Sequence, residues 1–172
     1  VGKKLEALKS DCLGQNIKSE IHYTGGHFLK NIHEVLEKIK FDLIVMGSHG
    51  VSSKEEWFLG SKTQKVVRKF HIPTLVVKRA PEKEEFNEVV YTSEMLSRDE
   101  AGFRHFLDFI APFNPQTVHL LMVNTGSYFS QPSILVKESL KRFKSIAAEF
   151  NCVPHFYSDY NIEAGIRHFS EE

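Results

Sequence analysis

The stretch DLIVMGSHG (residues 42–50) decides the fold of this chain. Residues 42–46 form an almost continuous apolar run that ends in a glycine, which is typical of a strand buried on both faces in a parallel sheet. Residues 61–70 follow as a predicted helix with Val66, Val67 and Phe70 facing inward, and residues 73–77 as a second buried strand. A helix between two such strands indicates parallel pairing through a right-handed crossover, and hence an α/β domain.

The rest of the chain alternates helices and strands in the same way. Further helices are predicted at residues 1–13, 27–40, about 98–111 and 132–150, and after 162. Further strands are predicted at residues 17–23, 88–92, 118–123 and 153–157. This order predicts a three-layer, doubly wound parallel sheet, which binds ligands at the carboxyl ends of its strands.

A weak internal repeat predicts how the chain is organised. Residues 5–10 resemble residues 140–145, and Tyr23-Thr24 matches Tyr157-Ser158, at a separation of about one domain length. Chance similarity between two helix–strand–helix units is the alternative. If the repeat is real, residues 1–79 are the C-terminal part of one repeat, 80–86 a linker, and 87–172 the N-terminal part of the next. We then expect the strands to rebuild one sheet in permuted order, within one chain or by exchange in a homodimer, because exposed sheet edges promote aggregation.

Composition favours a cytoplasmic protein without a nucleic-acid or membrane partner. Lys and Arg together number 22, as do Asp and Glu, so the formal net charge is zero. No apolar run approaches the ~20 residues of a membrane helix, and the start shows no signal-peptide pattern. The two cysteines, Cys12 and Cys152, lack metal-ligand spacing, and the basic run at residues 137–144 is interpreted as the exposed face of a helix.

Small residues after the strand at 42–46 have the properties of a phosphate site. Gly47 and Gly50 allow close approach of a ligand to the backbone, and Gly60 and Ser61 begin a helix whose free N–H groups attract anions. Ser61 is expected either to cap the helix or to donate to phosphate, and Lys62 adds charge. An ordinary strand–loop–helix connection is the alternative. The candidate binding residues are Met46, Gly47, Ser48, His49, Gly50, Gly60, Ser61 and Lys62.

Other chemistry has little support in the sequence. His22, His27, His33 and His71 form no metal-ligand pattern, and of the histidines only His49 is a candidate to touch a ligand. No catalytic residues are predicted, and no Gly-Lys-Ser/Thr motif for efficient phosphoryl transfer is present.

Residues 42–77 resemble the signature of the universal stress proteins, G-x2-G-x9-G-[S/T], through Gly47, Gly50, Gly60 and Ser61. The resemblance extends to residues 87–113 and 118–123, which are similar to the first strand and helix and to the second strand of the family. It implies the α/β fold shared with the adenine nucleotide α-hydrolases, and binding of ATP or AMP, with Mg²⁺ undecided. Thr92 and Ser93 stand where nucleotide-binding members usually carry an acidic residue, which puts the second repeat's pocket in doubt.

Three functions therefore remain open. The first is a stress-response regulatory module that binds an adenine nucleotide and responds through dimerisation or partner binding. The second is a dimerising scaffold of the same family that has lost its nucleotide. The third, an enzyme with weak ATP hydrolysis, has the least support.

Overall fold

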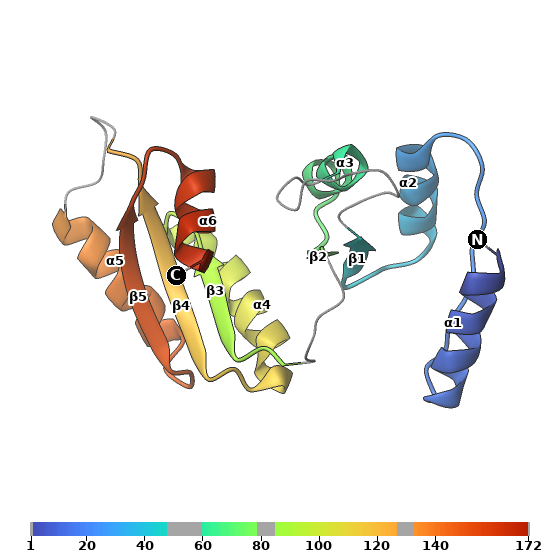
Figure 1. The fold of residues 1–172 in the computed structure, drawn as a ribbon, viewed down its shortest axis with the longest axis horizontal. Helices are drawn as coiled ribbons and strands as arrows, with labels where there is room; N and C mark the ends of the chain where they lie inside the picture. The colour runs from blue at the N-terminus through green and yellow to red at the C-terminus, as the bar shows by residue number, and fades with distance from the viewer. Residues whose placement is uncertain (1, 48–59, 79–84, 127–132, 172) are drawn as a thin grey trace. The chain divides into compact units, whose positions relative to one another are not determined.

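The computed structural model describes residues 2–47, 60–78, 85–126 and 133–171 (Figure 1). The chain divides into two compact units, Val1–Pro81 and Glu82–Glu172. The predicted linker 80–86 falls mostly outside the described residues; within it, the ring of Phe86 packs 4.6 Å from that of Phe113 in the second unit.

The first unit contains three helices and a two-stranded sheet among its described residues. Its elements are α1 (Gly2–Gly14), α2 (Phe28–Lys38), β1 (Ile44–Gly47), α3 (Ser61–Lys69) and β2 (Thr74–Val77). β1 and β2 are parallel, with Ile44 opposite Thr74 and Gly47 opposite Val77. Because α3 connects them, the strand–helix–strand unit predicted from residues 42–77 is confirmed.

Burial in this unit corrects two expectations. Val45 is 60% exposed, so the strand at 42–46 is not buried on both faces within its unit. The physical reason is a cavity between α2 and β1, which Val45 lines. Val67 is also exposed, whereas Thr63 and Val66 are the buried residues of α3.

The predicted strand at residues 17–23 is wrong, since this segment joins no sheet in the described part of the chain. Its ends, Ile17 and Tyr23, are 50% and 60% exposed. Alternation of apolar and polar residues is compatible with a strand, but a strand exists only where a neighbour satisfies its N–H and C=O groups.

The second unit is an α/β layer structure. Its elements are β3 (Glu88–Thr92), η1 (Ser97–Asp99), α4 (Glu100–Ile110), η2 (Ala111–Phe113), β4 (Thr117–Asn124), α5 (Ser133–Ile146), β5 (Cys152–Ser158) and α6 (Ile162–Glu171). The strands are parallel in the order β3-β4-β5. The predicted α/β fold class is confirmed. The union of this sheet with β1 and β2 in permuted order stays a prediction.

One face of this sheet carries the main core. Phe103 and Ile110 of α4 and Phe143 of α5 are buried against Val118 and Leu120 of β4. Each such side chain contributes roughly 1.5–3 kcal/mol through burial. Phe103, Phe106 and Ile110 of α4 pack in or against this core, whereas Phe109 of α4 and Phe113 of η2 are partly exposed.

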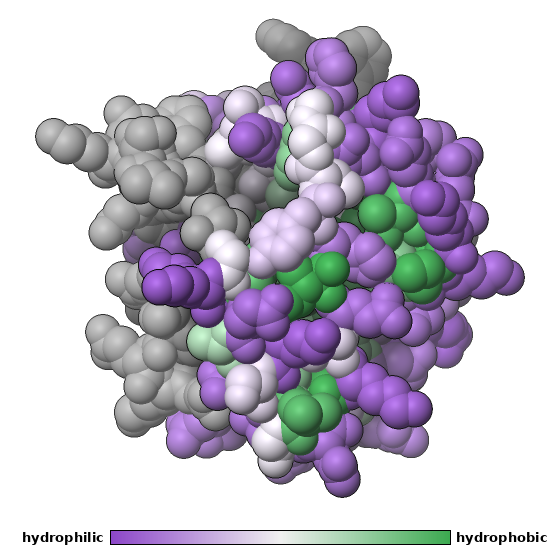
Figure 2. All heavy atoms as spheres, turned by 90° about the vertical axis from the view of Figure 1, so that its right-hand side faces the viewer, coloured by the Kyte–Doolittle hydropathy of each residue, from purple (hydrophilic) through white to green (hydrophobic). Residues whose placement is uncertain are grey.

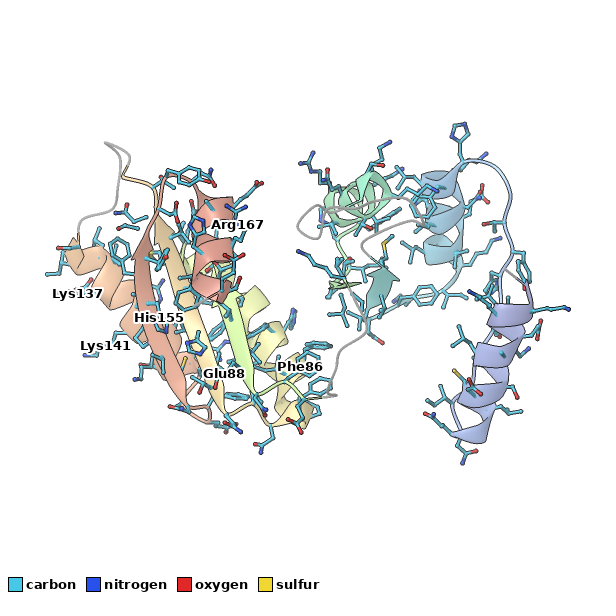
Figure 3. The ribbon with its side chains drawn as sticks, viewed as in Figure 1. Phe86, Glu88, Lys137, Lys141, His155 and Arg167 are labelled. Carbon is cyan, nitrogen blue, oxygen red and sulfur yellow. The ribbon has the colours of Figure 1, made fainter. Side chains whose placement is uncertain are left out.

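The outer face of α5 is basic, as the sequence predicts. Lys137, Lys141 and Lys144 are exposed, whereas Val136 and Leu140 are buried. Figure 3 shows Lys137 and Lys141 pointing away from the sheet. The helix ends at Ile146 rather than near residue 150.

Helix α6 covers the opposite face of the sheet. Side chains alternate along β4, so Val123 points away from the core that contains Val118, Leu120 and Met122. A Cβ added at Gly165 of α6 would lie 2.5 Å from Val123 Cγ1. Glycine at this position therefore allows α6 to approach β4 closely. Helix α6 forms the third layer of the second unit.

We expect Gly165→Ala to destabilise the second unit by about 1–3 kcal/mol, because the new methyl group overpacks against the stiff Val123 side chain. Gly102→Ala in α4 is the matched control: its Cβ would meet only Tyr91 Oη, at 4.0 Å. This control should be neutral or stabilise by up to about 1 kcal/mol through helix propensity. Urea unfolding of both variants checks the prediction, and equal effects would contradict it.

Candidate functional site

The end of β1 and the start of α3 are in contact. Thr63 Oγ1 donates a hydrogen bond to the carbonyl oxygen of Gly47 at 3.2 Å. Thr63 is only 2% exposed, so this bond forms in a protected position. The carboxyl end of the strand is thereby held against the first turn of the helix.

The helix start has the geometry expected of an anion-binding end. Gly60 is the N-cap of α3, with extended backbone angles, and Ser61 is the first helical residue. No side chain caps α3 among the described residues. The first N–H groups of a helix have no partner within it and carry its positive dipole end, so they favour a negatively charged group.

Lys62 extends from this first turn toward α2. Its Nζ lies 5.4 Å from the centre of the Phe28 ring, a cation–π contact between the two helices. The contact explains how a long, flexible side chain is held beside the helix start.

Two cavities adjoin Lys62. The larger, about 640 Å³, lies between α2, β1 and the segment before α2, and Met46 and Lys62 both line it. Its volume is within the range of small-molecule sites. The smaller, about 450 Å³, is basic and is lined by His27, Phe28, Leu29, Lys30, His33, Lys62, Lys65 and Lys69.

The structure brings together some of the predicted site residues. Met46 and Gly47 end β1, and Gly60, Ser61 and Lys62 begin α3. A Cβ at Gly47 would meet nothing within 4 Å, so open space lies beside this residue. Ser48, His49 and Gly50 lie outside the described residues.

Thr63 was missed by the sequence analysis, although a signal was available. It lies three residues before the buried Val66, on the same face of α3. A hydroxyl on an inward helical face needs a partner. The carbonyl oxygen of Gly47, at the end of the preceding strand, is that partner.

At the corresponding edge of the second unit, the polar groups bond to their own loop. Ser93 Oγ accepts a hydrogen bond from the Met95 amide at 2.9 Å, and Asp99 accepts one from the Leu96 amide at 3.1 Å. Glu94 forms an ion pair with Arg98. Thr92 ends β3 and is exposed. The loop after β3 thus directs its polar side chains toward its own backbone and neighbours.

Two polar clusters around α6 were also not predicted from the sequence. Asp159, at the end of β5, lies 2.7 Å from His168 Nδ1, and the hydrogen bond from His168 lowers the pKa of Asp159. Glu88, His119 and His155 form a second cluster on the sheet. The sequence could have indicated the second cluster, because side chains alternate between the two faces of a strand, which places His119, Leu121 and Val123 on one face of β4.

The described residues contain no group of three or more His, Cys, Asp or Glu side chains arranged to hold a metal ion. Nor is any helix in the described ranges both long and apolar enough to cross a bilayer. Cys12 and Cys152 are free thiols, and burial raises the pKa of Cys152, which favours its neutral form.

Comparison with known proteins finds similarity over the first unit. The family model described as "Universal stress protein family" matches residues 2–78. Universal stress protein MJ0577 of Methanocaldococcus jannaschii is 41% identical over 75 residues, which cover 38% of this chain and 46% of that protein. Universal stress protein MJ0531 of the same organism is 49% identical over 53 residues, covering 31% of each chain.

The chain therefore spans less than half the length of either relative. No solved structure matches it. The matched segment contains β1, α3 and β2, together with the contact between Thr63 and Gly47. Residues 2–78 of this chain are thus similar to the universal stress protein family.

Proposed function

We propose that this protein is a stress-response regulatory module that binds ATP or a related adenine nucleotide at the carboxyl end of β1. The phosphates would lie between the strand end and the start of α3, at Gly47, Ser48, His49, Gly50, Gly60, Ser61 and Lys62. The hydrogen bond from Thr63 to Gly47 carries the proposal, because it holds the two halves of this cradle together.

Electrostatics support a phosphate at this place. The uncapped start of α3 offers backbone N–H groups and the positive end of a helix dipole. Lys62 adds a full positive charge from the same turn, and further lysines line the adjoining basic cavity. A di- or triphosphate therefore suits the site better than an uncharged ligand.

The larger cavity supports binding of the base. Met46 and Lys62 line it together with apolar residues of α2, including Phe28, Ile32 and Val35. An apolar cavity next to a phosphate cradle is the arrangement that a nucleotide requires, with its flat base in one and its charged end in the other.

A dimerising scaffold without nucleotide is the second candidate. α1 has no buried residue, and Leu8, Leu13, Ile17 and Tyr23 of the first unit are between 50% and 75% exposed. Figure 2 shows apolar side chains grouped among hydrophilic ones on the surface turned to the viewer. Such surfaces favour association, and under this second candidate function the partner is a second copy of the chain, which gives a homodimer. In either reading we assign the protein to the cytoplasm.

Weak ATP hydrolysis is the third candidate. It requires Mg²⁺ and a group that orients water, and no residue described at the site supplies the second function. Release of phosphate above background, lost in the same variants that lose nucleotide, is the observation that this candidate needs.

We expect Gly60→Val to weaken binding of a labelled ATP analogue by at least about tenfold, a loss of roughly 1.4 kcal/mol. The new side chain would occupy the space that phosphate oxygens need beside the helix start. Gly14→Val, at the end of α1, is the control, because a Cβ there meets nothing within 4 Å. Absence of binding by the unaltered protein would instead favour the scaffold.

Thr63→Val should both destabilise the first unit and weaken nucleotide binding. Valine keeps the shape of threonine but leaves the Gly47 carbonyl without its donor, at a cost of about 1–3 kcal/mol. Thr74→Val is the control, because Thr74 donates only to Ile72, two residues away. Urea unfolding and equilibrium binding measure the two effects. If the Thr63→Val variant were as stable as the unaltered protein and bound nucleotide equally well, the hydrogen bond between Thr63 and Gly47 would no longer support the proposal.

A further inference from the structure

Three titratable side chains form a chain of hydrogen bonds on the sheet face beneath α6. His119 Nε2 lies 2.7 Å from Glu88 Oε2, and His119 Nδ1 lies 2.9 Å from His155 Nε2. Glu88 is on β3, His119 on β4 and His155 on β5, so the chain of contacts crosses the whole sheet. Figure 3 shows Glu88 and His155 on the two outer strands.

The register of the sheet explains why the two rings meet. His119 lies opposite Val153, and His155 lies opposite Leu121, so the histidines are diagonal neighbours on one face. Their ring centroids are 5.1 Å apart. This separation is close to the sum of the distance between the facing nitrogens and the distance from each ring centre to its own nitrogen. The two nitrogens therefore point toward each other.

Only one hydrogen atom fits between these two nitrogens. Thr117 Oγ1 donates to Glu88 Oε1 at 3.2 Å, which orients the carboxylate toward His119. Glu88 then accepts the Nε2–H of His119, and this leaves His119 Nδ1 with a lone pair that accepts from His155 Nε2–H. A carboxylate thereby selects the tautomer of one ring and the donor role of the other.

Helix α6 packs directly on this pair. The ring of Phe169 makes edge contacts with both, at 4.7 Å from His155 and 5.9 Å from His119. The Phe169 ring also makes an edge contact with the ring of Tyr157 on β5, with centroids 5.8 Å apart. The remaining titratable or charged groups of α6 are Glu163, Arg167, His168 and Glu171, of which His168 pairs with Asp159 rather than with this cluster.

We propose that Glu88, His119 and His155 form an acid-sensitive latch that holds the C-terminal turns of α6 on the sheet. As the pH falls, the pair takes up two protons in succession. After the first proton is bound, one hydrogen still lies between the facing nitrogens, and the hydrogen bond remains. The second places a hydrogen on both nitrogens, so the hydrogen bond is lost and two positive rings repel beneath Phe169.

The direction of the pKa shift agrees with this sequence of events. Burial first, and the neighbouring His119 second, lower the pKa of His155 from its ordinary value of 6.5. The unfolded chain then binds more protons than the folded one in the range just below 6.5, so stability falls as the pH falls through that range. Asp159 has a lowered pKa and loses its contribution only near and below 3.8, well apart from this window.

Hydrogen exchange of the α6 amides in the full chain tests the latch. Protection factors, which remove the intrinsic pH dependence of exchange, should fall as the pH falls below about 6.5, the ordinary pKa of histidine. In His155→Gln this pH dependence should be lost. His105→Gln, at an exposed position of α4, is the matched control and should keep it.

Glu88→Gln provides a second variant, because Glu88 is half exposed and its replacement is tolerated more easily. Without the carboxylate the protonated rings lose a stabilising charge in the folded protein, so the acid-induced fall in protection should become larger. Nuclear magnetic resonance of the two imidazoles should show two coupled titration steps. Independent single-step titration of His119 and His155, or α6 protection that does not change with pH in the unaltered protein, would overturn the proposal.

Discussion

Parallel pairing of adjacent strands is the constraint on which both units depend. Two parallel strands cannot be joined by a tight turn, so a helix must return the chain to the starting edge of the sheet. The carboxyl ends of the strands and the amino ends of the helices then share one edge. In the first unit this places Gly47 beside the first turn of α3, and the hydrogen bond from Thr63 secures the contact.

The same constraint organises the second unit in a different way. β3, α4, β4, α5 and β5 follow in one direction across the sheet, so α4 and α5 cover the same face and form the main core there. α6 leaves β5 on the other side, where glycine at 165 permits close packing on Val123. The two faces differ in chemistry: the first contains aromatic and aliphatic side chains, and the second contains the imidazole pair and Phe169.

The two units also differ from each other in the chemistry of their polar groups, and their proposed roles are separate. The first unit has an open cavity and a basic groove beside an uncapped helix start, which suits a charged ligand. The second unit bonds the polar groups after β3 to its own loop and places its titratable groups beneath a helix. The proposed ligand site and the proposed acid-sensitive latch therefore lie in different parts of the chain.

The sequence by itself determined the α/β class, most helices and strands, and the family resemblance, because apolar runs, helical stripes and glycine spacing are local patterns. It could not determine whether residues 17–23 form a strand or whether Val45 is buried, since both depend on neighbours that no local pattern specifies. For the site, the glycines, Ser61 and Lys62 were recognisable from spacing. Thr63, and the meeting of Glu88, His119 and His155, were decided only by the tertiary structure, because strand register and helix packing bring together residues that lie far apart along the chain.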